Sequence, residues 1–267
     1  MVDGRYTHGH HASVLRSHTW RTAENSAAYL LPHLRPGDAL LDVGCGPATL
    51  TADLAGLVAP GTVVAIDNAP AALAAAAETL AARAITGVRL EQSDVFALPY
   101  SAGSFDVVHA HQVLQHLSEP VRALCEMRRV CKTGGIVAAR DSDYPAMAWH
   151  PALPELERWM ATYLAVARAN GAEPAGGRHL LAWAQAAGFS EVTPSASVWC
   201  FATAPLRAWW GGLWAERVVA SAFAAQAVEI GVATPAELAT IAAGWRRWAA
   251  AEDGWFVVVN GEVLCRP

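Results

Sequence analysis

A glycine-rich turn directly after a short apolar run is the feature that most constrains this chain. Residues 39–43 (Ala-Leu-Leu-Asp-Val) read as a buried strand, residues 44–46 (Gly-Cys-Gly) as the turn, and a helix is predicted to open at Thr49. In a parallel sheet such a turn brings bare backbone against a ligand at the carboxyl end of the strand. A dinucleotide-binding fingerprint would place its third glycine at position 49. The carboxylate of Asp42, just before the turn, suits a cationic or amine-bearing cofactor better than a pyrophosphate.

Strands and helices are predicted to alternate from Ala39 to about Asp141. Strands alternating with helices imply βαβ units, right-handed crossovers and a parallel sheet covered on both faces. With 267 residues, of which 54% are hydrophobic and 16% charged, the chain can bury a large core in one domain. The predicted strands are 39–43, 63–67, 88–92, 105–110 and 135–140, and the predicted helices are 49–58, 71–84 and 120–130.

The pattern changes after Asp141. Residues 144–154 carry three prolines and are expected to form a loop, and residues 205–251 are helical in pattern, with a break at Thr234-Pro235. We expect this helical segment to form a cap over the open end of the sheet. Asn260-Gly261, between two apolar runs, is typical of a hairpin turn but also fits one bent strand. Further helices are predicted at 156–169 and 176–187, and a strand at 192–201.

The expected organisation is therefore one domain in three parts. Residues 1–35 form an N-terminal lid segment, residues 36–204 and 252–267 form the cofactor-binding part, and residues 205–251 form the cap.

Charge and cysteine usage exclude several classes of protein. The net charge of −5 and the absence of any Lys/Arg cluster argue against a nucleic-acid partner. The five cysteines are scattered and form no CxxC pair, so neither a metal site nor a disulfide framework is indicated. No apolar run reaches the roughly 18 residues of a membrane span. We therefore expect a cytoplasmic protein with reduced thiols, and the sequence leaves open whether it forms a homodimer.

Acidic residues follow the second and third predicted strands, at the edge where ligands bind in open parallel sheets. Asp67 lies about twenty residues beyond the glycine turn, where an acidic side chain can accept both ribose hydroxyls. Asp94 can accept a proton from an exocyclic adenine amine, and Val95 can offer a backbone N–H to a ring nitrogen. The alternative for each aspartate is a helix cap or a turn.

An ordered series of motifs over residues 36–141 resembles the class I S-adenosylmethionine-dependent methyltransferases. It is most similar to the small-molecule group that contains the ubiquinone/menaquinone-biosynthesis methyltransferases. The resemblance implies an α/β fold with a doubly wound, seven-stranded, mostly parallel Rossmann-like sheet, and S-adenosyl-L-methionine as cofactor. Its last strand is expected to be antiparallel. The matching motifs are Leu41–Pro47, Val64–Asp67, Gln92–Val95, Leu98–Tyr100 with Ser104–Val108, Val113–Leu117 and Arg128–Gly135.

The resemblance also implies a role for each residue at the strand ends. The turn would lie against the methionine part of the cofactor, with the Asp42 carboxylate directed toward its amino group. The second and third strands would hold the ribose and the adenine, and His111 would line the pocket near the sulfonium. The N-terminal segment would help to close the site. The implied contacts are Asp42, Gly44, Cys45 and Gly46 for methionine, Asp67 for ribose, Asn68, Asp94 and Val95 for adenine, and Tyr6, Trp20 and Arg21 for closure.

A general base would be needed by some acceptors, and histidine titrates near neutral pH. The candidates are His111, His116, Tyr6, His10 and His11. The structural alternatives are a cofactor wall for His111, a helix residue for His116, packing for Tyr6 and a solvated terminal arm for the other two histidines.

Eight of the eleven tryptophans lie after residue 180. The helical spacing of the pairs Trp210/Trp214 and Trp245/Trp248 favours packing within the cap, and the alternative is an aromatic wall for a flat or apolar substrate. Arg246 and Arg247 share a predicted helix and are interpreted as a solvated face, with a carboxylate clamp as the alternative.

The expected function is transfer of a methyl group, by in-line displacement, to an oxygen, nitrogen or carbon of a small molecule. One alternative is an NAD(P)-dependent oxidoreductase, against which Thr49 and the lack of a convincing Tyr-x-x-x-Lys pair both argue. The other is a non-catalytic member of the fold that binds S-adenosylmethionine or S-adenosylhomocysteine and transfers nothing.

Overall fold

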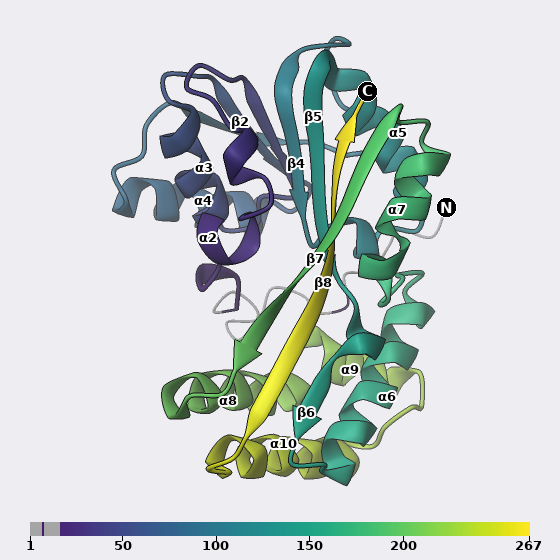
Figure 1. The fold of residues 1–267 in the computed structure, drawn as a ribbon. Helices are drawn as coiled ribbons and strands as arrows, with labels where there is room; N and C mark the ends of the chain where they lie inside the picture. The colour runs from purple at the N-terminus through teal and green to yellow at the C-terminus, as the bar shows by residue number, and fades with distance from the viewer. Residues whose placement is uncertain (1–6, 8–16) are drawn as a thin grey trace.

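The computed structural model of the chain describes Thr7 and residues 17–267. Three candidate residues of the N-terminal arm, Tyr6, His10 and His11, lie outside the described residues. The described chain forms a twisted sheet with helices on both faces, and a group of helices below it (Figure 1).

The sheet has eight strands in the order β3-β2-β1-β4-β5-β8-β6, with β7 also paired to β8. The pairs among the first five strands are parallel, whereas β8 runs antiparallel to β5, β6 and β7. Strand order reverses between β1 and β4, which is where ligands bind in open α/β sheets. The strands are β1 (Leu40–Val43), β2 (Val63–Asp67), β3 (Val88–Gln92), β4 (Phe105–His111), β5 (Cys131–Ser142), β6 (Ala148–His150), β7 (Glu191–Phe201) and β8 (Trp255–Arg266).

Helices cover both faces of the sheet. One face carries α2 (Ala23–Ser26) and α3 (Thr49–Val58), which bury Ala23, Leu54 and Val58 against it. The alanine-rich α4 (Pro70–Ala82) lies beside α3 because small side chains such as Ala52 and Ala76 allow close approach. The opposite face carries α5 (Pro120–Val130) and α7 (Gly176–Ala186).

The cap consists of four helices that pack around the lower ends of β7 and β8 (Figure 1). It begins in the chain with α6, which lies outside the segment 205–251 expected to form the cap. The predicted break at Thr234-Pro235 is present, and it is stabilised by reciprocal hydrogen bonds between Thr234 and Glu237. The cap helices are α6 (Pro154–Ala169), α8 (Ala204–Ala220), α9 (Ala222–Glu229) and α10 (Pro235–Ala250).

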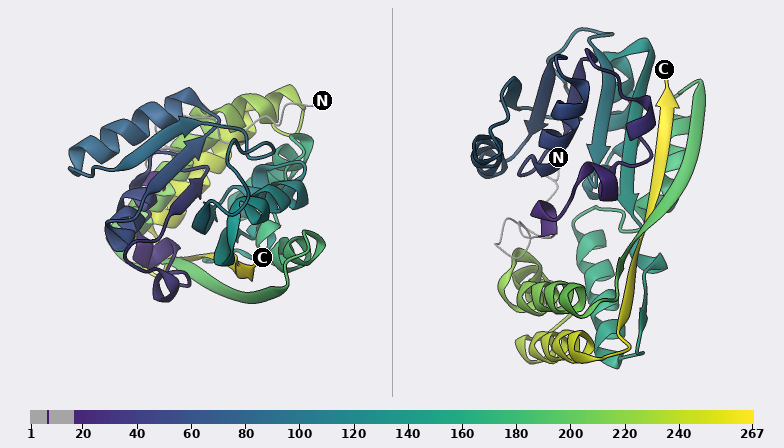
Figure 2. Two further views of the ribbon diagram at one scale, coloured as in Figure 1. Left: turned by 90° about the horizontal axis from the view of Figure 1, so that it is seen from above. Right: turned by 60° about the vertical axis from the view of Figure 1, so that its left-hand side comes forward.

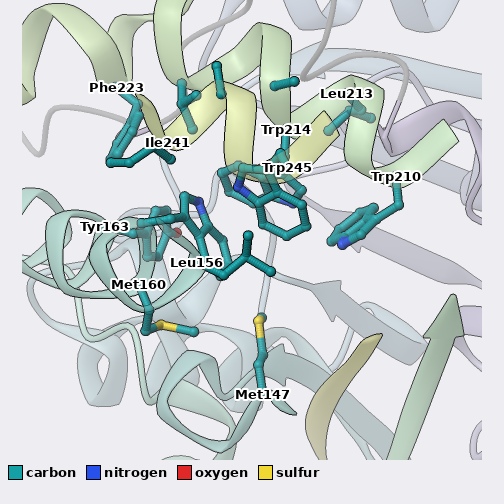
Figure 3. Packing of buried hydrophobic residues seen from close by; sticks show 14 of the residues in the cluster. Met147, Leu156, Met160, Tyr163, Trp210, Leu213, Trp214, Phe223, Ile241 and Trp245 are labelled. Carbon is teal, nitrogen blue, oxygen red and sulfur yellow. The ribbon is translucent and has the colours of Figure 1, made fainter. Parts of the chain in front are cut away.

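Tryptophan fills the interior of the cap, as Figure 3 shows for Trp210, Trp214 and Trp245. The Trp159 ring from α6 lies edge-on to Trp214 at 4.7 Å and to Trp245 at 4.9 Å. Such edge-to-face contacts are favourable beyond the area that they bury. The packing interpretation of the tryptophan pairs is therefore confirmed, and Trp210 also faces the cavity described below.

The expectation of seven strands is wrong, because the sheet has an eighth, β6. Its three residues lie in the segment predicted as a loop. They pair with Trp255–Val257 because β8 continues below β5 into the cap. The chain around Asn260-Gly261 forms no hairpin, and the two apolar runs form one strand of 12 residues. The doubly wound, mostly parallel α/β fold itself is confirmed.

Candidate functional site

A cavity of about 260 Å³ lies between the strand ends and the cap. Its upper wall is formed by the glycine turn and the ends of β2, β3 and β4, and its lower wall by the cap. The described chain from residue 17 onward starts between the sheet and the cap helices (Figure 2), and Ser17, His18, Trp20 and Arg21 line the cavity. Trp20 and Arg21, expected to help close the site, both line this cavity.

The glycine turn adopts a left-handed backbone at Gly44 (φ +69°) and Gly46 (φ +53°). This conformation is easily reached only without a Cβ atom. A Cβ atom on Gly44 would lie 2.5 Å from Cγ2 of Val113, whereas one on Gly46 would meet only the His18 ring, at 3.6 Å. The turn therefore presents bare backbone to the cavity at Gly46. Burial, and after it the charges of Asp42 and Asp67, raise the pKa of the Cys45 thiol far above its ordinary value, so this lining thiol stays protonated.

Asp67 ties the glycine turn to the end of β2. One carboxylate oxygen accepts a hydrogen bond from the Gly46 N–H at 3.1 Å, and the other accepts from the Ala69 N–H at 2.9 Å. The carboxylate also lines the cavity, beside Asn68. The sequence identified this residue as a ligand contact, and the structure adds that it orders the turn.

Asp42 is 3% exposed and holds two buried partners. Its oxygens lie 2.5 Å from the Thr51 hydroxyl and 2.8 Å from Nδ1 of His109. Because both oxygens already have partners, the carboxylate orders the strand end from within. A contact to the amino group of a cofactor stays a prediction.

Asp94 follows β3, and one of its oxygens accepts a hydrogen bond from the Phe96 N–H at 2.9 Å. This hydrogen bond is the turn interaction that the sequence offered as the alternative to a ligand contact for Asp94. Asp94 and Val95 nevertheless both line the cavity, so the turn holds the carboxylate at the cavity edge.

His111 is the last residue of β4 and lies at the centre of the cavity wall, 7% exposed. Its ring centroid lies 5.8 Å from that of Trp199. Burial, and after it the positive charges of Arg21 and Arg140, lower its pKa well below the ordinary histidine value. Neither ring nitrogen has a hydrogen-bond partner within the described part of the chain. The imidazole is therefore neutral at physiological pH, and a ring nitrogen can accept a hydrogen bond from a ligand.

His116 also lines the cavity, from the short 3-10 helix η2 (Leu114–His116). Burial, and after it Arg21, lower its pKa to about 4. In the unfolded chain the pKa would be close to the ordinary 6.5, so the unfolded state binds more protons at acid pH. The His116 contribution to stability is therefore intact above pH 6.5 and is lost as the pH falls from 6.5 toward 4.

We expect this difference in the His116 pKa between the folded and unfolded states to lower the unfolding free energy by about 2 kcal/mol when the pH falls from 7.5 to 5. Urea denaturation at the two pH values should show that His116→Gln loses less stability than the wild type, by that amount. Substitution of the exposed His33 by glutamine is the matched control and should leave the loss unchanged. An equal loss in the wild type and in His116→Gln would contradict the assignment.

Gln112 is a site residue that sequence reasoning missed. It has a left-handed backbone (φ +54°), and its side-chain amide donates to the Ser142 hydroxyl at 2.7 Å and accepts from Arg21 at 2.8 Å. Gln112 thus joins Arg21, in the N-terminal segment beside the cavity, to Ser142 on β5. Its position directly after a strand end was the available signal. Arg217, Tyr144 and Ser142 also line the cavity and were not identified.

A buried polar row crosses the sheet beside His111. Arg140, which is opposite His111 in the β4–β5 register, bonds Glu262 on β8 at 3.1 Å. Its guanidinium lies 4.6 Å from the Trp199 ring centroid. The contact between the Arg140 guanidinium and the Trp199 ring holds Trp199 at the cavity wall. Arg246 and Arg247 take no part in lining the cavity, since Arg246 is exposed and Arg247 pairs with Glu155.

No group of three or more potential metal ligands is present among residues 7 and 17–267. In the same part of the chain no helix is both long enough and apolar enough to cross a bilayer.

Comparison with known proteins bears on this arrangement. The family model described as a methyltransferase domain matches residues 34–188. An uncharacterized methyltransferase of Schizosaccharomyces pombe is 31% identical over 97% of this chain and 95% of its own length. The demethylmenaquinone methyltransferase of Bacillus mycoides is 34% identical over 43% of this chain and 48% of its own. Among solved structures, the YcgJ protein of Bacillus subtilis shares the fold with a TM-score of 0.58 and 16% identity, covering 90% of this chain and 96% of that one.

Proposed function

Because the chain belongs to the S-adenosylmethionine-dependent methyltransferase family, we propose that it methylates an oxygen, nitrogen or carbon atom of a small molecule. It is an enzyme of this family, and S-adenosyl-L-methionine is its cofactor. We propose the chemical class of the acceptor, and the residues that bind the cofactor and the acceptor.

The single observation that carries the proposal is that one cavity joins the glycine turn to the cap. Gly46, Asp67 and His111 line it from the strand ends, and Trp210 lines it from the cap, with the Trp199 ring centroid 5.8 Å from that of His111. A cofactor held at the strand ends would therefore present its reactive group to a molecule held under the cap. The cavity is enclosed by large side chains on the cap side, which suits a small molecule.

The residues present fit this cofactor. Three carboxylates lie at the ends of β1, β2 and β3, and bare backbone faces the cavity at Gly46. The cofactor supplies the methyl group on a sulfonium centre, from which it passes to the acceptor by in-line displacement. In our proposal the turn residues Gly44, Cys45 and Gly46 and the carboxylate of Asp42 hold the methionine part, Asp67 the ribose, and Asn68, Asp94 and Val95 the adenine.

The chain's own contribution to the reaction is placement and proton transfer. Holding two reactants in one closed geometry removes much of the entropy cost of their encounter. His111 lines the cavity with two ring nitrogens that have no hydrogen-bond partner in the described part of the chain, so one of them can accept a hydrogen bond, and then the proton, from a hydroxyl, amine or enol acceptor. We propose His111 as the base, with His116 as a second candidate on the same wall. Tyr6, the third, lies outside the described residues.

Asp67→Ala should weaken the binding of S-adenosylhomocysteine and S-adenosylmethionine roughly thirty- to a hundredfold. The substitution removes a charged acceptor for the ligand and also the hydrogen bond that orders Gly46. Hydrogen bonds to a charged group contribute about 1.5–3 kcal/mol each, and 1.4 kcal/mol corresponds to about a factor of ten. Isothermal titration calorimetry with both ligands, and with NADH, measures the effect.

Asp253→Ala removes an exposed carboxylate at the far end of the cap and should bind both adenosyl ligands as the wild type does. Clear NADH binding, or no adenosyl binding by the wild type, would overturn the proposed cofactor site. Transfer of a labelled methyl group to members of a small-molecule panel then tests turnover. Adenosyl binding without transfer to any phenol, amine or enol would favour the non-catalytic alternative.

A further inference from the structure

Two side chains in the cavity wall keep buried nitrogen atoms without a hydrogen-bond partner in the described part of the chain. They are His111, at both ring nitrogens, and Trp210, at its indole Nε1. His111 is 7% exposed and Trp210 is 6% exposed, and both line the cavity. Unpaired buried polar groups cost free energy, and a ligand that supplies the missing partners recovers it.

Neighbouring polar side chains of the cavity differ, because they are paired within the protein. The Gln112 amide donates to the Ser142 hydroxyl at 2.7 Å, and this hydroxyl donates to the Asn260 side chain at 3.0 Å. Asp42 likewise has a partner for each of its carboxylate oxygens. A ligand would therefore gain hydrogen bonds at His111 and Trp210 without breaking one inside the protein.

Trp210 differs from other tryptophans of the cap by its position. The indole N–H groups of Trp159 and Trp245 also lack a partner in the described chain, but neither residue is part of the cavity lining found there. The Trp210 ring stacks on Phe201 at 4.3 Å, and its nitrogen lies at the ring edge remote from Leu213 (Figure 3). An indole N–H can only donate, so the partner that it lacks is an acceptor such as a carbonyl oxygen.

His111 requires a different partner. Burial lowers the pKa of His111 well below the ordinary histidine value, so the ring is neutral at physiological pH. A neutral imidazole has one nitrogen that donates and one that accepts. The accepting nitrogen lacks a donor, and a hydroxyl group on the ligand would supply it.

Aromatic rings form another part of the cavity wall. Trp20 and Trp199 both line the cavity and lie edge-on to each other at 5.4 Å. The Trp199 centroid lies 5.8 Å from that of His111. Rings of this kind favour an aromatic ligand by stacking and by edge-to-face contact. Apolar walls with a few polar groups that fix orientation are typical of small-molecule sites.

We propose that the methyl acceptor is an aromatic compound with both a hydroxyl group and a carbonyl group. Its hydroxyl donates a hydrogen bond to His111, and its carbonyl oxygen accepts one from the Trp210 N–H. This inference rests on the proposed function, because it names the acceptor of that same reaction. Trp210 is a specificity-determining residue here, since an analogue without the carbonyl leaves the buried N–H unpaired.

The test uses three isomers, 5-, 6- and 7-hydroxy-1-tetralone, which differ in the spacing between the hydroxyl and the carbonyl. Each is compared with 1-tetralone, which lacks the hydroxyl, and with the matching tetrahydronaphthol, which lacks the carbonyl. Calorimetric titration of the protein saturated with S-adenosylhomocysteine should show that at least one isomer binds at least tenfold more tightly than both of its analogues.

Substitutions separate the two contacts. Trp210→Phe keeps an aromatic ring and removes the N–H, so it should lose most of the preference for the hydroxytetralone over the tetrahydronaphthol and keep the preference over 1-tetralone. His111→Phe should show the reverse pattern. Trp245→Phe is the matched control, because it removes an equally unpaired N–H that does not line the cavity, and it should keep both preferences.

Each outcome decides a separate point. If the wild type binds no isomer more tightly than both of its analogues, the proposed acceptor class is overturned, even if every variant fails to fold. If Trp210→Phe keeps the full preference for the carbonyl, or Trp245→Phe loses it, the role of Trp210 is overturned. Retention of the hydroxyl preference in His111→Phe overturns the contact with His111.

Binding of S-adenosylhomocysteine is measured first. Its absence would overturn the proposed function, whereas its presence without a preference for any hydroxytetralone overturns only this inference.

Discussion

Gly44→Ala is expected to abolish tight binding of S-adenosylhomocysteine and to lower the unfolding free energy by about 2–5 kcal/mol. Two costs combine at this position. A left-handed backbone costs a residue with a Cβ atom about 1–2 kcal/mol, and Gly44 has φ +69°. The new methyl group would also lie 2.5 Å from Cγ2 of Val113, and overpacking of this kind costs about 1–3 kcal/mol. Relief of either cost shifts the turn that faces the cofactor.

Calorimetry with S-adenosylhomocysteine and urea denaturation measure the two effects. The double variant Gly44→Ala/Val113→Ala should recover part of the stability, because it removes the methyl group with which the alanine collides. Gly212→Ala is the matched control, since a Cβ atom there meets nothing within 4 Å. Wild-type affinity and stability in Gly44→Ala would contradict the geometry of the turn.

Gly261→Ala is expected to be the most destabilising alanine substitution that we describe. A Cβ atom on Gly261 would lie 2.0 Å from the carbonyl oxygen and 2.5 Å from the carbonyl carbon of Gly177, where α7 packs against β8. Ordinary overpacking costs about 1–3 kcal/mol. Backbone atoms cannot move aside as a side chain can, so we expect Gly261→Ala to lower the unfolding free energy by about 4 kcal/mol or more.

Denaturation by urea, followed by near-UV circular dichroism of the cap tryptophans, measures this loss. Gly56→Ala, in the last turn of α3, is the control, because a Cβ atom there meets no described atom within 4 Å. It should be neutral or stabilising by up to about 1 kcal/mol. A urea midpoint of Gly261→Ala close to that of the wild type would show that α7 and β8 are not in this close contact.

The part of the fold that sequence could predict is the part governed by local pattern. The glycine turn, the strand ends and the alternation of strand and helix between Ala39 and Asp141 follow from short-range chemistry, and the structure contains them. Asp67 was identified because its distance from the turn in the sequence is fixed by one βαβ unit. His111 was predicted to line the pocket from its place at a strand end and from the family resemblance, and it lines the cavity.

The features that sequence could not predict depend on contacts between distant segments. Asn260-Gly261 suggests a turn, yet Gly261 is needed for contact with Gly177, and the Asn260 side chain accepts a hydrogen bond from the Ser142 hydroxyl at 3.0 Å. These requirements come from α7 and β5, so the sequence around Asn260-Gly261 does not reveal them. Arg217 likewise lies in a helix that reads as apolar packing, and only the fold brings it to the cavity.

The connection between β7 and β8 has a consequence for how such enzymes diversify. The two strands are neighbours that pair from Phe201↔Phe256 up to Glu191↔Arg266, so residues 202–254 are topologically a single, very long hairpin loop. Trp210 and Arg217 both lie within it, whereas Asp67 and the glycine turn lie outside. If the cap contacts the acceptor as we propose, exchange of this one contiguous segment is expected to change the acceptor preference while Asp67 and the glycine turn stay in place.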